Sequence, residues 1–333
     1  MPLAEKLSQE DLIVYELFRH PVLCGEFINN YDRLTWEEEF EFTYYQKEIL
    51  CDFNSNVDIC QARATGKCLH KDSKILNPLT GELDTVKNWF LRGDLNSIIS
   101  INDFWKQKIG KPTIEPNGIQ DCIEIKTVNG FKTIVTKEHP ILTNKGFIET
   151  QKLNVGDFIA VPTKISYFGN TSVFSENEIK ILAHFIAEGT YKVGSITTTE
   201  NETIKDIYDY ALEKNLKIRN DGITYFITYK VGIKNSYLTL LEKSNIRFCH
   251  SYNKFIPKEI FKEPKEKISL FLKKLFDGDG WCLSNNEHIE VGYATTSEIL
   301  ARDIKHLLLR FGIQTSLIFK KNKKFISYPI RKI

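Results

Sequence analysis

The sequence predicts a multidomain chain of three unlike segments: a short, mainly α-helical piece over residues 1–67, an all-β segment over 68–165 and an α/β unit over 175–333. A chain of 333 residues suits two or three domains at about 100–200 residues each. Short β-rich runs between turn signals fill the middle segment, and a helical pattern with an acidic end occurs twice in the last one. Each segment therefore has its own pattern of predicted secondary structure.

The overall composition is that of an ordinary globular chain, and it excludes several classes of protein. The formal net charge is only +2, so any affinity for nucleic acid must come from local basic patches. No apolar run approaches the ~18–20 residues of a membrane span, and the N-terminus carries acids within its apolar pattern, unlike a signal peptide. The seven cysteines form no Cys-x-x-Cys pair, which favours a reducing cytoplasm over a disulfide framework or a zinc site.

Residues 1–67 combine helical periodicity with the start of a phosphate-binding loop. Helical patterns precede the short apolar run VDICQA, which leads into Gly66-Lys67. This order is expected at the entry to a nucleotide-binding α/β domain. The next residue should be Ser or Thr, whose hydroxyl is a ligand of magnesium. It is Cys68, and a thiol is a poor ligand for that hard cation.

The stretch QARATGK, with FTYYQKEIL upstream, resembles the start of viral terminase large subunits and related helicase-like ATPases. The resemblance covers only residues 1–67, and Gln61 stands where a Walker A loop has its first glycine. A lone Gly-Lys pair in an unrelated loop is the alternative, and a freestanding ATPase with a cysteine in its loop is a rival interpretation. The resemblance implies ATP as the cofactor of the uninterrupted host protein, bound by Gly66, Lys67, Arg63 and, at the adenine, Gln46.

The middle segment, residues 68–165, reads as many short strands. The β-rich runs SKIL, SIISI, DCIEIKTVNGFKTIVT and HPILTNKGFIE alternate with turn signals. Asn129-Gly130 lies between two strand-like runs, which is a strong hairpin signal. We therefore expect an all-β fold here.

The last segment contains an internal repeat. Ser175 and Glu178 form a capping-box pattern at the start of one helix, which should end at Glu188-Gly189. A second helix should begin near Pro264 and end at Asp279-Gly280, so the two terminal glycines are 91 residues apart. Each helix is followed by the order strand, Thr-rich cap, helix, strand. Two copies of one α/β unit, related as a pseudo-dimer, are the simplest interpretation.

The paired helices carry one acid each, Glu188 and Asp279, at the same place in each copy. If a pseudo-two-fold axis relates the copies, both carboxylates meet near that axis beside small residues. Such a pair can hold a divalent cation that activates water and stabilises the leaving oxygen of a phosphodiester. The alternative is two ordinary acids at helix ends, but the helix dipole disfavours an acid there, and both copies have one.

The stretches LAHFIAEG and LKKLFDGDG resemble the two motifs of LAGLIDADG homing endonucleases, and NKFIPKEIF before the second motif resembles that family too. The resemblance covers about residues 175–333. It implies two αββαββ halves whose sheets sit on double-stranded DNA, and magnesium-dependent cleavage by Glu188 and Asp279. One departure is Lys274, which stands where the family has a small residue; Ala183 satisfies that rule in the first copy. A DNA-binding protein that has lost cleavage is therefore a rival. The candidate contacts to DNA phosphates are Lys320, Lys321, Lys323 and Lys324, and the alternative is that these lysines form a solvated surface turn.

The stretches CLHKDSKIL, TIVTKEHPILT and LNVGDFIAVP resemble the N-terminal splicing blocks of an intein, with its Hint fold. Cys68 would attack the carbonyl of Lys67 and form a thioester, an N–S acyl shift. His139 suits the role of distorting the amide or protonating its nitrogen, and Thr136 that of holding the scissile peptide or its oxyanion. The alternative is a plain buried thiol and a structural loop histidine.

These resemblances predict an intein with a homing endonuclease, inserted in the Walker A loop of a terminase-like ATPase whose N-extein is residues 1–67. A full intein closes with its own His-Asn pair before a Cys, Ser or Thr of the host, and this sequence ends at SYPIRKI. We therefore expect an incomplete Hint domain that cannot splice alone, with a C-terminal intein/extein fragment as a partner. The Ser or Thr hydroxyl that the phosphate-binding loop needs would then be supplied by the first host residue after the inserted intein.

Overall fold

The computed structural model describes residues 68–102, 106–190, 193–228, 235–247, 249–285, 288–319 and 326–327. All of them belong to one compact unit, which spans residues 62–333. Within these ranges no helix has the length and apolar character needed to cross a bilayer. Residues 1–67, for which the sequence predicts a mainly α-helical piece, lie outside the described residues, and so do these predicted site residues: Gln46, Arg63, Gly66, Lys67, Lys320, Lys321, Lys323 and Lys324.

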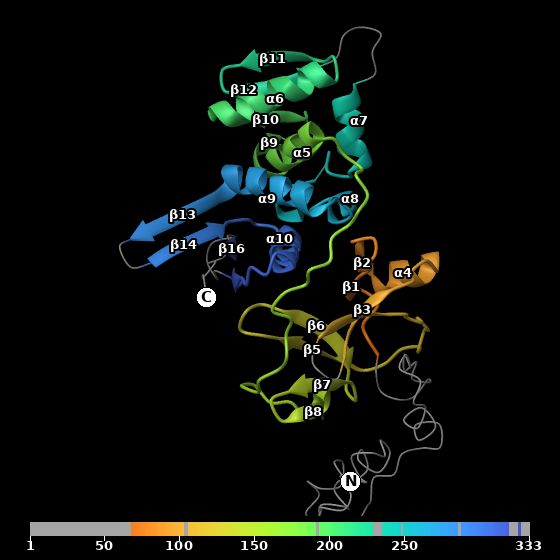
Figure 1. The fold of residues 1–333 in the computed structure, drawn as a ribbon. Coiled ribbons are helices and arrows are strands. Elements are labelled where there is room, and N and C mark those ends of the chain that lie inside the picture. Colours follow the sequence, from red (N-terminus) through yellow and green to blue (C-terminus); the bar gives the residue numbers. More distant parts are fainter. Residues whose placement is uncertain are drawn as a thin grey trace, which may run out of the picture. The chain divides into compact units, whose positions relative to one another are not determined.

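The segment after Cys68 consists of two-stranded antiparallel pairs (Figure 1). The expectation that it is all-β is wrong at one place, because helix α4 (Val86–Arg92) follows the first pair. Thr85 caps this helix by accepting a hydrogen bond from the Asn88 backbone, and Gly93 ends it in the left-handed region. The pairs are β1 (Lys74–Leu76) with β2 (Leu83–Thr85), β3 (Ile98–Ile101) with β4 (Gln107–Gly110), β5 (Cys122–Lys126) with β6 (Lys132–Thr136), and β7 (Pro140–Thr143) with β8 (Gly146–Glu149).

The hairpin predicted from Asn129-Gly130 is confirmed as β5–β6. Lys126 pairs with Lys132 at its closed end, and Cys122 pairs with Thr136 at its open end. Gly130 has φ +80°, a conformation that a side chain would strain. Strand β6 therefore runs from a glycine turn to the threonine of the predicted splice site.

The C-terminal part repeats the order helix, hairpin, helix, hairpin, as the LAGLIDADG resemblance implies (Figure 1). In the first half the strands form one antiparallel sheet in the order β11-β12-β10-β9. The first half consists of α5 (Glu176–Glu188), β9 (Gly189–Thr190), β10 (Ser195–Thr197), α6 (Asn201–Glu213), β11 (Lys217–Asp221) and β12 (Thr224–Thr228). The second consists of α9 (Lys265–Asp279), β13 (Gly280–Asn285), β14 (His288–Tyr293), α10 (Glu298–Arg310), β15 (Ile318–Phe319) and β16 (Ile326–Ser327). Between them lie α7 (Ser236–Lys243) and α8 (Lys258–Phe261).

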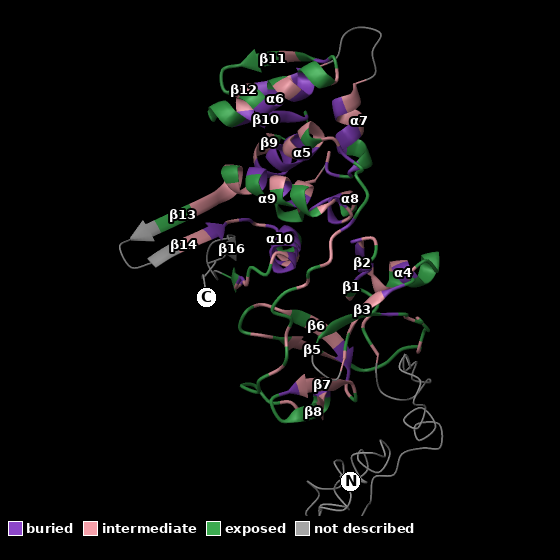
Figure 2. Ribbon diagram, viewed as in Figure 1, coloured by how far each residue is buried: buried purple, intermediate pink, exposed green. Residues whose placement is uncertain are grey.

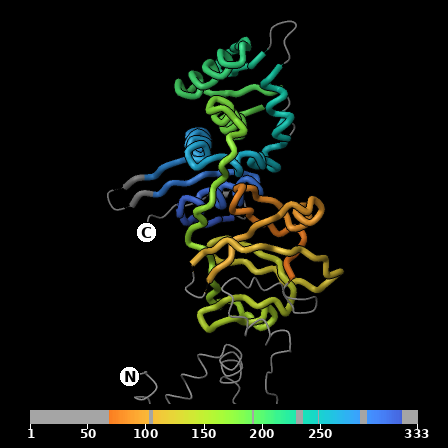
Figure 3. The backbone as a smooth tube through the Cα atoms, turned by 45° about the vertical axis from the view of Figure 1, so that its right-hand side comes forward, coloured from red at the N-terminus to blue at the C-terminus, as the bar shows by residue number. Residues whose placement is uncertain are grey.

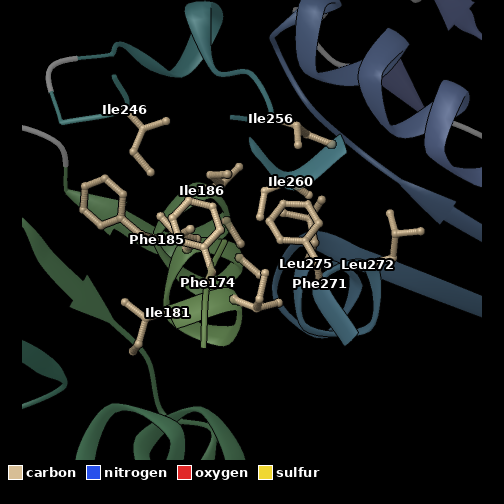
Figure 4. Close-up of a cluster of buried hydrophobic side chains, with 14 of the residues drawn as sticks. Phe174, Ile181, Phe185, Ile186, Ile246, Ile256, Ile260, Phe271, Leu272 and Leu275 are labelled. Atoms are coloured by element: carbon tan, nitrogen blue, oxygen red, sulfur yellow. The ribbon is translucent and has the colours of Figure 1, made fainter. Parts of the chain in front are cut away.

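The hydrophobic core is centred on α5 and α9 (Figures 2 and 4). Phe185 of α5 and Phe271 of α9 are fully buried, with Ile260 of α8 beside them. Each such side chain contributes about 1.5–3 kcal/mol when removed from water. The helix pair at the centre of the repeat is therefore tightly packed and gives a firm base for the residues at its ends.

The β-rich segment and helix α10 share this core. Leu76 of β1 and Leu83 of β2 belong to the same buried cluster as the helices. Arg310 of α10 donates hydrogen bonds to the carbonyl oxygens of Gly81 (2.9 Å) and Phe261 (2.8 Å) and is fully buried. Figure 3 shows the orange β1–β2 region against the blue C-terminal elements. The two segments are thus packed together rather than joined by a free linker.

Candidate functional site

The first candidate site lies where α5 and α9 end. Ser175 and Glu178 form the predicted capping box at the start of α5, and Gly189 ends that helix directly after Glu188. Helix α9 ends in the same way, with Gly280 directly after Asp279. A Cβ added to Gly278 would lie 2.6 Å from the Cβ of Ala187, so the two helices meet closely at this point. The predicted acids are therefore the last helical residues on either side of a close helix crossing.

The Glu188 and Asp279 carboxylates lie in partly buried surroundings that disfavour their charge. Burial raises the pKa of Glu188, and the negative charges of Asp279 and Glu200 raise it further, against a hydrogen bond from Thr198. Burial also raises the pKa of Asp279, against the positive charge of Lys254 and a hydrogen bond from Tyr293. The Tyr293 hydroxyl lies 3.2 Å from Oδ2 of Asp279. Two acids that repel each other's charge form a centre that a cation would stabilise.

Lys254 is a site residue that our sequence analysis did not name. Its ammonium donates a 2.9 Å hydrogen bond to the carbonyl oxygen of Ala187, one residue before Glu188. Burial lowers the pKa of Lys254, while the charges of Asp279 and Glu188 raise it. The signal was present, because Lys254 lies within the NKFIPKEIF stretch that carries the family resemblance. Lys254 therefore places one positive charge beside both carboxylates.

The donor set at this crossing fits a divalent cation such as Mg²⁺. Oε2 of Glu188 is buried and has no hydrogen-bond partner among the residues that the structure describes. Two carboxylates are too few to enclose an ion, and within the described ranges no group of three or more His, Cys, Asp or Glu side chains is arranged so that it could hold a metal ion. Mg²⁺ usually takes one or two protein carboxylates and completes its shell with water and phosphate oxygens. Glu188 and Asp279 would therefore form an open magnesium site, in which phosphate oxygens could complete the coordination of the ion.

Lys274, which stands where the LAGLIDADG family has a small residue, is accommodated beside the helix pair by contacts to α6. Its side chain is buried and its ammonium lies 2.7 Å from Asp206 and 2.6 Å from Glu202, both on α6. Ala183, its counterpart in the first copy, is also fully buried. The close approach of the helices instead lies one turn further along, at Ala187 and Gly278.

The second candidate site surrounds Cys68. The carbonyl oxygen of Cys68 accepts a 3.2 Å hydrogen bond from the Thr136 backbone, and Leu69 bridges to Val135. The backbone at Cys68 and Leu69 therefore lies alongside the end of β6 and pairs with it in the antiparallel direction. Thr136 is buried, at 3% exposure. The predicted nucleophile and the predicted threonine are thus brought together by main-chain pairing.

The turn from Thr136 to His139 is held by several hydrogen bonds. The His139 backbone donates to the carbonyl oxygen of Thr136 over 3.2 Å. The carbonyl oxygen of His139 accepts from both the backbone (2.9 Å) and the hydroxyl (2.7 Å) of Thr150. This fixes the backbone from which the His139 side chain projects. All three predicted residues, Cys68, Thr136 and His139, lie in one corner of the β-rich segment.

A second residue missed from the sequence is Asn117. Its side-chain amide donates a 3.0 Å hydrogen bond to the sulfur of Cys68. The contact joins residues 49 positions apart in the chain, so no local pattern could reveal it.

The repeat of helix and hairpin, with an acid at each helix end, defines the class of fold, and the comparisons agree. Residues 266–331, from the first turn of α9 onwards, match the family described as the LAGLIDADG-like domain. The C-terminal part of the chain therefore carries a LAGLIDADG-like α/β fold.

Several curated proteins are similar to most of this chain. It is 26% identical to Protein RecA of Mycobacterium tuberculosis over 265 residues, covering 75% of this chain and 33% of that protein. It is 29% identical to the Replicative DNA helicase DnaB of Synechocystis sp. over 271 residues, covering 75% and 31%. It is 27% identical to the ATP-dependent DNA helicase Hel308 of Methanocaldococcus jannaschii over 300 residues, covering 84% and 22%. The chain thus spans about a third or less of the length of these relatives.

Two solved structures show a limited likeness. The N-terminal LAGLIDADG domain of DUF199/WhiA has a TM-score of 0.33 and 11% identity, covering 49% of this chain and 80% of that chain. I-DmoI in complex with DNA and Mn has a TM-score of 0.31 and 14% identity, covering 47% of this chain and 89% of that chain.

Proposed function

We propose that residues 175–333 are a magnesium-dependent endonuclease that cleaves double-stranded DNA. The observation that carries the proposal is the meeting of Glu188 and Asp279 at the crossing of α5 and α9, where burial raises the pKa of both carboxyls. A bound Mg²⁺ would supply an activated water and stabilise the leaving oxygen. Glu188 and Asp279 would hold it, and the buried oxygen of Glu188, which has no hydrogen-bond partner in the described part of the chain, supports that role.

Other residues around the carboxylates have supporting roles in this proposal. The Lys254 ammonium is oriented by its bond to Ala187 and offers positive charge to a phosphate at the site. Tyr293, fully buried, holds Asp279 in place through its hydroxyl. Lys217 and Arg219 are exposed on β11 and alternate with partly buried Ile218, so both lie on the same face of the strand. They join the four lysines at 320–324 as candidate phosphate contacts.

Cleavage of DNA that carries the uninterrupted host gene tests this proposal. The purified protein should produce double-strand breaks only when magnesium is added. Glu188→Gln and Asp279→Asn should each reduce cleavage by about a hundredfold or more, since removing even a group that only supports a metal ligand costs about 10–100-fold. Glu176→Gln, an exposed acid at the other end of α5, is the matched control and should cleave normally. Intact DNA at every magnesium concentration, with binding retained, would favour the rival of a DNA-binding protein that has lost cleavage.

We also propose that Cys68 begins a self-splicing element, the first part of an intein. The thiolate attacks the carbonyl carbon of Lys67, the carbon–nitrogen bond of that peptide breaks, and the freed amine of Cys68 takes up a proton. Thr136 and His139 would hold the scissile peptide and protonate its nitrogen. The pairing of Cys68 with the end of β6 supports the assignment, because it holds the nucleophile beside both residues.

The curated relatives support an inserted element. A RecA protein, a replicative helicase and Hel308 have different names, yet each match covers three quarters or more of this chain, so any two matches share at least half of it. An element carried by different host proteins would produce this pattern. The host proposed here is a terminase-like ATPase, with residues 1–67 as its N-extein and ATP as cofactor only after splicing. A C-terminal intein/extein fragment would supply the closing steps, and the exposed thiols of Cys122 and Cys282 suit a reducing cytoplasm.

Mass spectrometry with and without added thiol tests the junction. A small thiol should intercept the thioester and release residues 1–67 from the wild-type chain. Cys68→Ala should release nothing, and Cys122→Ala, which removes an exposed thiol elsewhere, should behave as wild type. Equal release from Cys68→Ala would exclude the thioester, and no release from the wild-type chain would favour the rival of a freestanding ATPase.

A further inference from the structure

The sulfur of Cys68 has a specific hydrogen-bond donor, the side chain of Asn117. Its Nδ2 lies 3.0 Å from Sγ of Cys68. From Glu115 to Cys122 every residue is exposed except Asn117, which is half-buried. The one inward-turned side chain of this loop is therefore the one that contacts the predicted nucleophile.

The loop is braced so that Asn117 faces the cysteine. Gly118 has φ +66°, which turns the chain directly after Asn117. The Gln120 side-chain amide then donates a 3.1 Å hydrogen bond back to the carbonyl oxygen of Asn117. Strand β5 begins two residues later at Cys122, which pairs with Thr136. The donor is thus tied to the same hairpin that carries the threonine of the site.

We propose that Asn117 is a further catalytic residue of the cysteine site, whose amide N–H stabilises the Cys68 thiolate for attack on the Lys67 carbonyl. The inference rests on the function proposed above for Cys68. A hydrogen bond to an ionised acceptor is roughly twice as strong as one to a neutral acceptor, so this contact favours the thiolate over the thiol. The amide takes no proton: the thiol proton leaves to solvent, and solvent or His139 returns one to the freed amine.

Two other cysteines have the opposite arrangement. The Cys122 thiol donates to the carbonyl oxygen of Gln120 at 3.6 Å, and the Cys249 thiol donates to that of Asn245 at 3.4 Å. In both of these contacts the thiol donates its proton to a carbonyl oxygen, whereas the sulfur of Cys68 accepts a hydrogen bond from an amide. Cys68, whose sulfur accepts, should therefore be more reactive near neutral pH than Cys122.

Alkylation with iodoacetamide, followed by peptide mass spectrometry on the full chain, tests the inference directly. Asn117→Ala should slow alkylation of Cys68 about tenfold at neutral pH, the factor expected on losing one hydrogen bond to a charged group. Asn117→Asp keeps the shape but replaces the N–H donor with a negative charge, so it should slow alkylation further. Cys122 serves as the internal control, and Asn220→Ala, at an exposed position on β11, serves as the control variant.

The outcomes separate this inference from the function it builds on. Slower alkylation in both Asn117 variants, with unchanged thermal melting, supports the contact, and slower thiol-induced release of residues 1–67 then assigns it to catalysis. Unchanged alkylation of Cys68 in either variant overturns the inference whatever happens to release. Slower alkylation in the variants, with no release from the wild-type chain, removes the splicing function and with it the catalytic assignment, leaving only the stabilised thiolate.

Discussion

The ammonium of Lys274 lies 2.7 Å from Oδ2 of Asp206, and both side chains are only 4% exposed. This buried ion pair links α9 in the second half of the repeat to α6 in the first. Burial disfavours a charged Asp206, but hydrogen bonds from His184, Lys274 and Lys180 hold the pKa of its carboxyl well below the usual range. Lys274, which stands where the family has a small residue, therefore joins the two halves of the repeat through an ion pair.

Breaking this ion pair should destabilise the fold strongly. Lys274→Ala leaves a buried carboxylate with fewer cations, and the expected cost is about 3–5 kcal/mol. Urea unfolding at neutral pH measures it. The double variant Lys274→Met with Asp206→Asn should recover part of the loss, since it removes the uncompensated charge while the amide oxygen can still accept from His184 and Lys180. Lys273→Ala, an exposed neighbour that also contacts Glu202, is the control; a similar loss there would contradict the account.

Divalent-cation binding should weaken as the pH falls, and from a higher pH than for ordinary carboxylates. Because burial raises the pKa of both Glu188 and Asp279, protons compete with the cation above the usual carboxyl range. Without a cation, the raised pKa values mean that stability falls as pH rises through them. Calorimetric titration of Mg²⁺ or Mn²⁺ at several pH values, with Glu188→Gln as control, measures the effect. Binding independent of pH would exclude this pair as the ligand set.

Acid should remove the contribution of Asp84 to stability. Burial opposes its charge, but hydrogen bonds from Lys258 and Asn88, from the Thr85 backbone and from Arg92 lower the pKa of Asp84 from 3.8 to about 2. A lowered carboxyl pKa stabilises the fold above the unfolded value and ceases to do so as the pH falls through the folded value. Asp84→Asn should therefore cost about 2 kcal/mol at neutral pH and progressively less in acid. Denaturant unfolding of the unchanged protein and of Asp84→Asn, at neutral pH and in acid, measures this difference in the free energy of unfolding.

The control for Asp84 is a second partner of the same arginine. Asp94 also pairs with Arg92, but its side chain is 56% exposed. Asp94→Asn should change the free energy of unfolding by less than about 1 kcal/mol. Equal effects of the two substitutions would mean that burial of Asp84 is not the cause.

Adding one methyl group at the helix crossing should disturb the carboxylate site. Gly278→Ala places a Cβ 2.6 Å from that of Ala187, which must push α9 away from α5. The expected cost is about 1–3 kcal/mol, together with weaker Mg²⁺ binding. The compensating double variant with Ala187→Gly should restore both, and Asp277→Ala, an exposed neighbour, should change neither. An unchanged free energy of unfolding and unchanged Mg²⁺ binding in Gly278→Ala would show that the close approach of the two helices is not required.

Local sequence patterns determined the elements that local physics controls. The capping box at Ser175 and Glu178, the glycines after Glu188 and Asp279, and the Asn129-Gly130 turn each act within a few residues, and the structure has them where the patterns predict. The same kind of signal existed for α4, since Thr85 and Gly93 cap it. Its seven residues were too short to outweigh the β-rich runs around it.

The sequence by itself therefore determined the repeat, the two acid-ended helices and the candidate cysteine with its threonine and histidine. Only the tertiary structure decided which side chains meet. Lys254 reaches Ala187 across 67 positions, Lys274 reaches Asp206 on another helix, and Asn117 reaches Cys68 from a loop. These contacts depend on how packed helices and paired strands bring distant segments together. Since a hydrogen bond acts only within about 3.5 Å, no spacing along the chain encodes such a meeting.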